Sequence, residues 1–560
     1  MSPNESSCVP QSHPAVRYWW PWLDVDGETI LLWVCLVVAL LVATWYYFVI
    51  AKARSKKTMM STLGRLPPGP PGVPIFGNLP TLDKNLHHHL TRLAKTYGPV
   101  MSLRLGRRLC VVVSSPSVAK ELLKEQDAIV ANHDVPTSAM VLPNGLHGLA
   151  WAPHGQQWRT LRRLTVGGLL SSASLDPYRP LRRRKISQMV QRVHDCAVAG
   201  APVQVRNLVY STLYDVITGM LWGGVLQEKG MEKAAKEFRQ VVEDIQGTFG
   251  RLNISDFFPI LAPLDLQGLE RKRKKIADRL HRILDSIISQ RQRVIMEEQS
   301  STNSDQEKED VDFLQLLLRA KDSSGETAMP LTMDHIKGLF LDLVMAGMDT
   351  TTTTIEWAMS EMIENKETMR KVQEELDQVV GSLEHNLVDE THLPNLHYLN
   401  AVVKETLRLH PAAPIMLPRT PSKDCTAGGY MIPRGCRIIV NLWGMQRDSD
   451  AWDRPSVFDP ERFLNINMKG ADNIIKKWDF SGNDFHFFPF GTGRRICPGA
   501  LLADRMLTYS LAALLHSFDW RLPESRTTLD LTEKFGVVLR KLEPLVLVPS
   551  RRRASTRSAY

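Results

Sequence analysis

Residues 490–499 read FGTGRRICPG, and the interpretation of the whole chain follows from this decapeptide. Two glycines allow a tight, hairpin-like loop, and Cys497 follows that loop directly. Pro498 then opens an apolar helix, since proline is tolerated in the first helical turn, where its missing N–H would be unpaired. A cysteine ahead of a helix N-terminus and close to Arg495 is expected to have a lowered pKa and to exist as the thiolate.

A thiolate at this position suggests an iron ligand. Haem iron takes an axial cysteine thiolate where electron density must be pushed towards O–O cleavage. A single cysteine is by default buried and inert, but the surrounding pattern FxxGxRxCxG argues against that default. We therefore take Cys497 as the candidate metal ligand.

Length and composition set the limits for the remaining chain. Its 560 residues suit either several ordinary domains or one large catalytic fold. With 43% hydrophobic and 23% charged residues it is neither a disordered chain, a collagen-like repeat nor a polytopic membrane protein. The net charge of +9 selects no partner by itself. Seven scattered cysteines argue against a disulfide scaffold and for a reducing compartment.

The stretch ILLWVCLVVALLVATWYYFVIA, residues 30–51, carries no charge and predicts one transmembrane helix. A helix of that length is about 33 Å long and crosses a hydrocarbon core of about 30 Å. A buried core helix rarely lacks every charge over such a length, and the run is too long for a cleaved signal peptide. Basic residues follow the span and acidic residues precede it, so the tail 1–29 is expected across the membrane and the body in the cytosol. Asn4 begins a glycosylation sequon whose use stays open.

The rest of the chain divides into a spacer, a body and a tail. Residues 52–80 combine a basic flank with LPPGPPGVP, which predicts a stiff, non-helical hinge. Helical periodicity dominates 81–550, and alternating runs at 101–105 and 109–114 predict a small sheet. The fold class is therefore mainly α with small β-sheets, followed by a basic tail, 551–560. We expect the triplet His87-His88-His89 to be a surface feature rather than a metal site.

Three further motifs precede or flank the decapeptide. Glu405 and Arg408 are spaced i,i+3 on a predicted helix, a spacing common on surface helices. Asp349 and Thr350 lie within a predicted helix from about 334 to 365, where an acid beside an alcohol provides a proton relay; the alternative is a capping-like polar patch. Trp158 and Arg162 are spaced i,i+4 and so face one side of a helix.

In this order the motifs resemble those of cytochromes P450, in particular plant-type, membrane-anchored microsomal ones. The resemblance covers the anchor, the hinge and essentially all of the body. It implies the P450 fold, haem b (iron protoporphyrin IX) ligated by the thiolate of Cys497, a structural triad of Glu405, Arg408 and Arg462, and proton delivery by Thr350 and Asp349. It further implies cofactor contacts from Trp158, Arg162, Arg419 and Arg495, which would bind the propionates, and from Phe490, Gly493, Gly499, Ala346 and Gly347.

The resemblance also implies an activity and its partners. These are hydroxylation with O2, electrons from NADPH–cytochrome P450 reductase, a lipophilic small-molecule substrate, membrane lipid, and a single-pass position in the endoplasmic reticulum membrane with the body cytosolic and the tail lumenal. Nucleic acid is not an expected partner, since the basic run 271–275 is interpreted as a solvated helix face. Residues 478–485 and 533–536 resemble a plant branch that includes sesquiterpene hydroxylases.

Several readings of the substrate and the reaction stay open. A terpenoid is the first expectation, and a flavonoid or phenolic substrate is the second. The resemblance implies a substrate pocket lined by 131–151, Leu343, Ala346, 412–416 and 535–538, which are mostly apolar. A haem-thiolate isomerase or dehydratase, or a non-catalytic haem protein, is the alternative of another class. The retained acid–alcohol pair at Asp349 and Thr350 counts against it.

Overall fold

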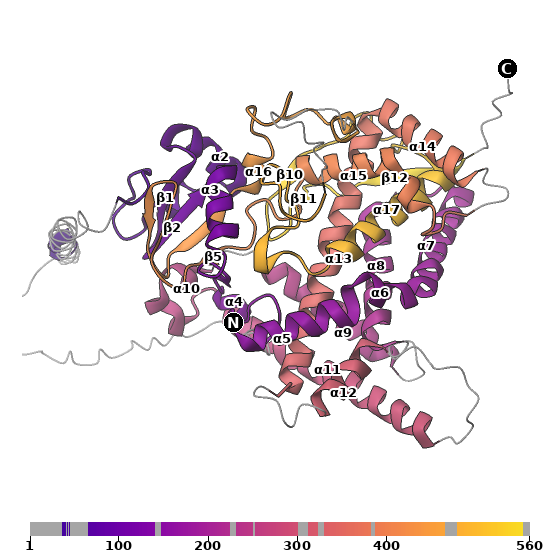
Figure 1. The fold of residues 1–560 in the computed structure, drawn as a ribbon, viewed down its shortest axis with the longest axis horizontal. Helices are drawn as coiled ribbons and strands as arrows, with labels where there is room; N and C mark the ends of the chain where they lie inside the picture. The colour runs from indigo at the N-terminus through magenta and orange to yellow at the C-terminus, as the bar shows by residue number, and fades with distance from the viewer. Residues whose placement is uncertain are drawn as a thin grey trace, which may run out of the picture. The chain divides into compact units, whose positions relative to one another are not determined.

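One long helix, α13 (Met333–Glu364), runs through the body of the protein (Figure 1). The computed structural model describes residues 36–37, 39–40, 42, 44, 65–140, 147–223, 231–249, 253–300, 312–322, 330–381, 387–464 and 479–552. The helix begins with a capping box, in which the Thr332 hydroxyl accepts the N–H of His335 while His335 Nδ1 accepts the N–H of Thr332. Its bounds agree with the expected 334–365, and most of its residues are buried, as in a helix that is apolar on all sides.

Other helices surround α13 and bury its apolar faces. Helices α8, α14, α15 and α17 pack directly on it, and its side chains contribute to the largest hydrophobic core. The longer helices are α2 (Leu86–Tyr97), α5 (Gln156–Thr165), α7 (Arg179–Ala199), α8 (Val205–Trp222), α9 (Glu232–Phe249), α11 (Leu269–Ser300), α12 (Phe313–Asp322), α14 (Lys366–Val380), α15 (His397–Leu409) and α17 (Ala500–Ser517). The shorter ones are α3 (Pro116–Lys120), α4 (Thr137–Met140), α6 (Ser172–Leu175), α10 (Ile254–Phe257) and α16 (Leu442–Met445).

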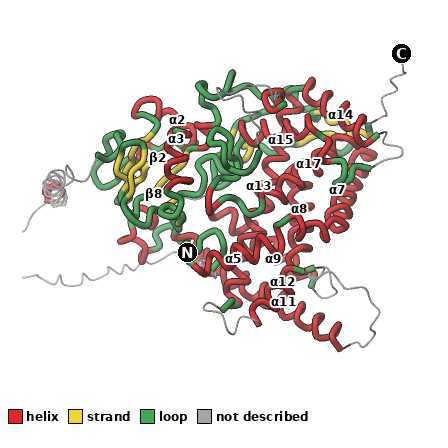
Figure 2. The backbone as a smooth tube through the Cα atoms, viewed as in Figure 1, coloured by secondary structure: helices red, strands yellow, loops and turns green. Residues whose placement is uncertain are grey.

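In the described part of the chain, four small sheets accompany the helices, and the largest lies to one side of them (Figure 2). Its strand order is β1-β2-β8-β5-β3, with β2 and β8 parallel and the other pairs antiparallel. Its strands are β1 (Val100–Leu105), β2 (Arg108–Val113), β3 (Asn132–His133), β5 (Arg419–Thr420) and β8 (Arg437–Val440). The others are β4 (Val203–Gln204), β12 (Val546–Arg551) and β9 (Phe518–Arg521) in one sheet, and the pairs β6 (Cys425–Ala427) with β7 (Tyr430–Ile432) and β10 (Glu533–Lys534) with β11 (Arg540–Lys541). The mainly helical fold and the sheet at 101–105 and 109–114 are confirmed.

The proline-rich segment belongs to the body instead of preceding it. The chain divides into two compact units, Met1–Arg65 and Leu66–Tyr560, so the second begins earlier than the expected residue 81. Ser102 of β1 donates from its N–H to the carbonyl of Pro68 and from its hydroxyl to that of Pro67. A side chain at position 69 would collide with the Ser102 carbonyl, and only glycine permits this approach. At the other end, Arg552 is ion-paired with Asp377, so the expected tail 551–560 begins inside the fold.

The predicted membrane span, 30–51, lies mostly outside the described residues; only 36–37, 39–40, 42 and 44 are described, and they are helical. Within the described part of the chain, no helix has both the length and the apolar character needed to span a bilayer.

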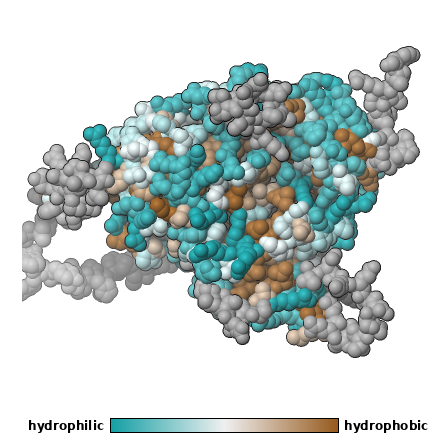
Figure 3. Space-filling model, viewed as in Figure 1, coloured by the Kyte–Doolittle hydropathy of each residue, from teal (hydrophilic) through white to brown (hydrophobic). Residues whose placement is uncertain are grey.

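On the face of the body shown in Figure 3, most of the surface is hydrophilic, and hydrophobic side chains gather in the area of α9 and α12.

Candidate functional site

The cysteine loop is a closed turn held by its own backbone. The N–H of Cys497 donates to the carbonyl of Phe490 over 2.9 Å, and the N–H of Ile496 donates to that of Gly493 over 3.1 Å. Gly493 has a positive φ, and a side chain there would strike the carbonyl of Leu123. The ring of Phe490 packs edge-on against Phe480, with ring centroids 4.9 Å apart. The turn therefore presents Cys497 in a defined position ahead of α17.

Cys497 opens onto an internal space. The residue lies deep within the fold, yet its side chain is exposed, so the exposed surface faces inward. Burial raises the pKa of its thiol and outweighs the opposing effects of the Gly499 N–H and the Arg162 charge. The expected lowering of this pKa is therefore wrong for the protein chain alone, and the nearby cation is Arg162 rather than Arg495. A coordinated metal ion deprotonates a thiol outright. Metal binding would therefore give Cys497 the negative charge that it lacks in the protein chain alone.

Three arginines gather beside this space without an acidic partner. Arg495 donates to the carbonyls of Ala131, Leu149 and Ala152 over 2.5–2.9 Å, and Arg162 donates to that of Ile496 over 2.6 Å. Arg419 is buried and its Nε has no hydrogen-bond partner.

Among the described residues, none of Arg162, Arg419 and Arg495 forms an ion pair with a carboxylate. Burial, together with the charges of Arg419 and Arg162, lowers the pKa of Arg495 to about 9, and burial lowers that of Arg419 to about 10. Buried or half-buried cations that repel one another are stabilised by an anion, and paired carboxylates fit the bidentate geometry of the guanidinium groups.

Trp158 holds one of these arginines in place. Its indole N–H donates to the carbonyl of Leu149 over 3.1 Å, so this donor is already used within the protein. The guanidinium of Arg495 lies over the indole ring, 4.4 Å from its centroid. The structure therefore gives Trp158 a positioning contact with Arg495, and its direct contact with the cofactor stays a prediction.

Helix α13 turns one exposed stripe towards the same region. Ala346 is exposed although Val344 and Met348 on the same helix are buried, and Thr350 is partly exposed with its hydroxyl donating to the Ala346 carbonyl over 2.6 Å. Asp342 of α13 interacts electrostatically with Arg495, which places the cysteine loop next to this helix. We call the space between α13 and the cysteine loop the chamber.

Two of the predicted residues on α13 contact other elements of the protein. A side chain at Gly347 would meet Ile217 of α8, so this glycine allows close helix packing, and its contact with the cofactor stays a prediction. Asp349 is buried, and its carboxylate is ion-paired with Arg206 of α8 and Arg540 of β11. Neither arginine is part of the sequence motif, and nothing in the local sequence indicates them.

The structure brings together Glu405, Arg408 and Arg462. Glu405 and Arg408 are fully buried and bonded through two contacts of 2.7 and 2.8 Å, and Arg462 Nε lies 3.1 Å from Glu405 Oε1. Arg408 also donates to the carbonyls of Gln446, Pro455 and Val457. The network thus ties α15 to the segment 446–463, with its charged groups hydrogen-bonded throughout.

Sequence reasoning missed Asp342, which holds the segment 147–152 against α13. Its carboxylate accepts the N–H of Ala150 over 2.8 Å and interacts with that of Leu149. Gly148 and Gly338 come so close that a side chain on Gly338 would lie 2.8 Å from the Gly148 nitrogen. The only sequence signal was one acidic residue in an apolar helix. Burial raises the pKa of Asp342 to about 6.

Two further segments complete the walls. The N–H of Leu539 donates to the carbonyl of Ala412 over 3.0 Å, which joins the expected lining segments 412–416 and 535–538. The carbonyl of Leu539 accepts from Thr353 and Trp357 of α13. Met416 extends to Gly491 of the cysteine loop. These contacts bring both segments alongside α13 and the cysteine loop.

Comparison with known proteins identifies this arrangement. The sequence profile of the cytochrome P450 family matches residues 67–548. The chain belongs to the cytochrome P450 family. It is 36% identical to a ferruginol synthase from Isodon rubescens over 88% of this chain and 97% of that protein, and 37% identical to a flavonoid 3',5'-hydroxylase from Solanum melongena over 86% and 90%. A zebra fish cytochrome P450 structure with progesterone shares the fold, with a TM-score of 0.68 and 24% identity over 83% of this chain and 99% of that one.

Membership makes the protein a cytochrome P450 monooxygenase with a haem-thiolate cofactor. The residues described above fit that cofactor. An inward-facing thiol, one buried and two half-buried guanidinium groups that form no ion pair with a described carboxylate, and the small side chain of Ala346 match an iron, two propionates and a flat ring.

We predict that Glu405→Gln destabilises the fold by about 3–5 kcal/mol, because it leaves Arg408 fully buried without its counter-charge and removes the shorter of the two carboxylate contacts of Arg462. Chemical denaturation of the purified protein measures the change. Glu367→Gln is the matched control, since Glu367 and Arg370 have the same i,i+3 spacing on an exposed surface. Little or no change is expected there, and equal effects of both substitutions would contradict the argument.

The raised pKa of Asp342 predicts a pH-dependent stability difference. A carboxyl group with a folded pKa of about 6 and an ordinary value of 3.8 destabilises the fold above pH 6, and this effect fades as the pH falls towards 4. Asp342→Asn removes the effect while keeping an acceptor for Ala150. The stability of the variant relative to the parent should therefore fall by on the order of 1 kcal/mol between pH 7.5 and pH 5.0. A pH-independent difference in denaturation free energy would refute the assignment.

Proposed function

We propose that this protein hydroxylates a lipophilic terpenoid, with electrons delivered by NADPH–cytochrome P450 reductase. Relatives named ferruginol synthase and sugiol synthase, each 36% identical over most of their length, support the terpenoid class. The observation that carries the proposal is the chamber itself. It is lined by an inward-facing thiol on one side and by Ala346 and Thr350 of α13 on the other, beside apolar segments such as 412–416. Such a lining binds a weakly polar substrate.

In this proposal Cys497 is the ligand of the haem iron and Gly499 supports it, because the Gly499 N–H donates to the cysteine sulfur. Arg162, Arg419 and Arg495 bind the two propionates through charge-assisted hydrogen bonds. Trp158 keeps Arg495 oriented through its ring. When bound, the haem supplies the activation of O2 and the transfer of one oxygen atom to the substrate.

Thr350 and Asp349 deliver protons to the chamber. The Thr350 hydroxyl now donates to a carbonyl of its own helix, and a rotation about χ1 redirects this hydrogen. Asp349 is neutralised by Arg206 and Arg540, and Arg540 is one-third exposed. Arg206, which is mostly buried, therefore holds the Asp349 carboxylate in place, and Arg540 connects it to solvent. A proton reaches Asp349 when the contact with Arg540 opens.

Membrane attachment is also part of the proposal. Ile75 and Phe76 on the proline-rich segment are exposed, and so are Ile260 and Leu264 on the segment after α10. The two segments adjoin, since the rings of Phe76 and Phe258 lie 5.8 Å apart. Exposed apolar residues on neighbouring segments form a surface suited to lipid. A position at the endoplasmic reticulum surface, with the reductase in the same membrane, accords with this surface.

A flavonoid substrate is the second candidate. It is favoured by the flavonoid 3',5'-hydroxylase from Solanum melongena, which is 37% identical to this chain. A planar phenolic ring would also fit between apolar walls, so the chamber alone does not separate the two classes.

We predict that Cys497→Ser abolishes the far-red-shifted absorption band of the ferrous–CO form, because a hydroxyl is a much weaker electron donor to iron than a thiolate. The measurement is a difference spectrum of the haem-loaded variant. Cys436→Ser, at another buried cysteine, is the matched control and should keep the band. Retention of the band in Cys497→Ser would remove Cys497 as the ligand.

A substrate panel tests the activity. Microsomes containing the full chain and a reductase are supplied with NADPH, isotopically labelled O2 and a set of terpenoids and flavonoids. A terpenoid product that carries one labelled oxygen atom is expected. A labelled flavonoid alone would replace the first candidate with the second. A product that forms without NADPH and carries no label would indicate an isomerase or dehydratase instead.

A further inference from the structure

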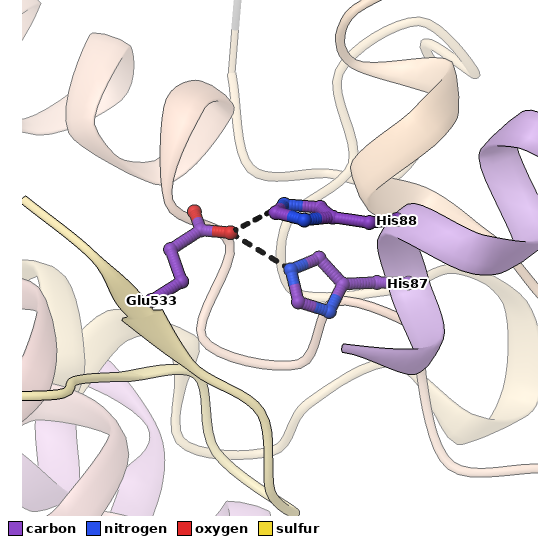
Figure 4. A group of neighbouring side chains, drawn as sticks. All are labelled: His87, His88 and Glu533. Atoms are coloured by element: carbon purple, nitrogen blue, oxygen red, sulfur yellow. Dashed lines mark hydrogen bonds and ion pairs between the residues drawn. The ribbon is translucent and has the colours of Figure 1, made fainter. Parts of the chain in front are cut away.

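A cluster outside the chamber joins the start of α2 to β10. His87 and His88 lie in the first turn of α2, and both rings point at the same carboxylate oxygen of Glu533 (Figure 4). The distances from Oε2 are 2.7 Å to His87 Nε2 and 3.0 Å to His88 Nε2. The expectation that this histidine triplet lies at the surface is therefore wrong for His87, which is fully buried.

The second oxygen of Glu533 is held by other groups. Oε1 lies 3.2 Å from His410 Nδ1 and 3.3 Å from Trp443 Nε1, with Arg447 3.8 Å away. The carboxylate is thereby fixed through Oε1 and offers Oε2 to the two histidines alone. Outer groups that orient a carboxylate in this way are typical of metal centres.

The imidazole rings are also oriented. The ring of His87 stacks on Phe535, with centroids 5.4 Å apart, and meets Trp443 edge-on at 5.2 Å. The ring of His88 contacts Trp443 at 4.6 Å. Because aromatic neighbours restrict both rings, their nitrogens converge without further ordering of the side chains.

The charged groups that face the cluster come from neighbouring elements. The surrounding charges are Glu361, bonded to His410, on the negative side and Arg447 on the positive side.

Ligand type and spacing indicate the metal. Two imidazole nitrogens and one carboxylate oxygen form a common three-residue zinc set, in which water occupies the fourth position. The three ligand atoms lie within 4.8 Å of one another. Zinc bonds of about 2.0–2.1 Å in tetrahedral geometry place such atoms about 3.3 Å apart, so Glu533 Oε2, now 2.7 and 3.0 Å from the two nitrogens, needs to move away from them by only about 0.3–0.6 Å. His88 is 38% exposed, which leaves a path for the ion and its water.

We propose that His87, His88 and Glu533 bind one zinc ion, which fastens β10 to α2. Phe535 to Leu539 follow Glu533 directly and lie beside the chamber through the contacts of Leu539 with α13. The zinc site would therefore stiffen one wall of the chamber from the outside. This inference does not depend on the substrate or the reaction assigned above.

The test measures zinc bound to the haem-loaded full chain, prepared without a histidine tag and freed of metal by chelation. Titration calorimetry with ZnCl2 should show one tight site. His88→Ala should weaken it by about 100-fold or more, and so should Glu533→Gln, which keeps the shape of the side chain but not its charge. His89→Ala is the matched control, since His89 belongs to the same triplet but contacts Arg92; its affinity should equal that of the parent.

The outcomes separate zinc binding from a plain hydrogen-bonded contact. An unchanged ferrous–CO spectrum in each variant shows that the fold and haem are retained. Absence of a stoichiometric site in the parent, or equal affinities of His88→Ala, His89→Ala and the parent, would overturn the proposal. Zinc protection against thermal unfolding in the parent and His89→Ala, but not in His88→Ala, provides the second readout.

Discussion

The buried pair of Glu405 and Arg408 is the contact on which the cysteine loop depends. Removing the two charges from water is costly, and the cost is offset because nearly every polar atom of both groups has a partner. Through Arg408 the pair holds the segment 446–463. Phe463 at the end of that segment packs against Phe487, and from there aromatic contacts reach Phe480 and Phe490. The position of Cys497 is thus the end of a chain of contacts that begins with one ion pair.

Beside the chamber, the arginines are not paired with carboxylates as they are near Glu405. Near Glu405 each guanidinium meets a carboxylate, whereas Arg162, Arg419 and Arg495 have only carbonyls or no partner. Three cations grouped together, one buried and two half-buried, are stabilised by an anion from outside the chain. The carboxylate of Asp342 lies close to them but is committed to the backbone of the segment 147–152. The arginines that are paired with carboxylates thus stabilise the fold. The three that have no such pair are those we propose to bind the cofactor.

Local chemistry made much of the architecture predictable. The capped, apolar helix α13 and the alternating strands β1 and β2 appear where the pattern placed them. The predictions that were wrong share another cause. Each concerns a residue whose surroundings come from a segment distant in sequence. Pro68 is bound by Ser102, and the pKa of Cys497 is raised by burial that no local motif reports. The partners of Asp349 come from α8 and β11 for the same reason.

Two ion pairs with identical spacing show what the sequence decides and what the tertiary structure decides. Glu405 with Arg408 and Glu367 with Arg370 both read ExxR, and in both the helix alone brings carboxylate and guanidinium together. The sequence by itself determined these contacts, as it determined the turn that carries Cys497, because both depend on neighbours a few residues away. Only the tertiary structure decided that one pair is fully buried and the other exposed. Desolvation depends on what packs around a charge, and no local spacing encodes it.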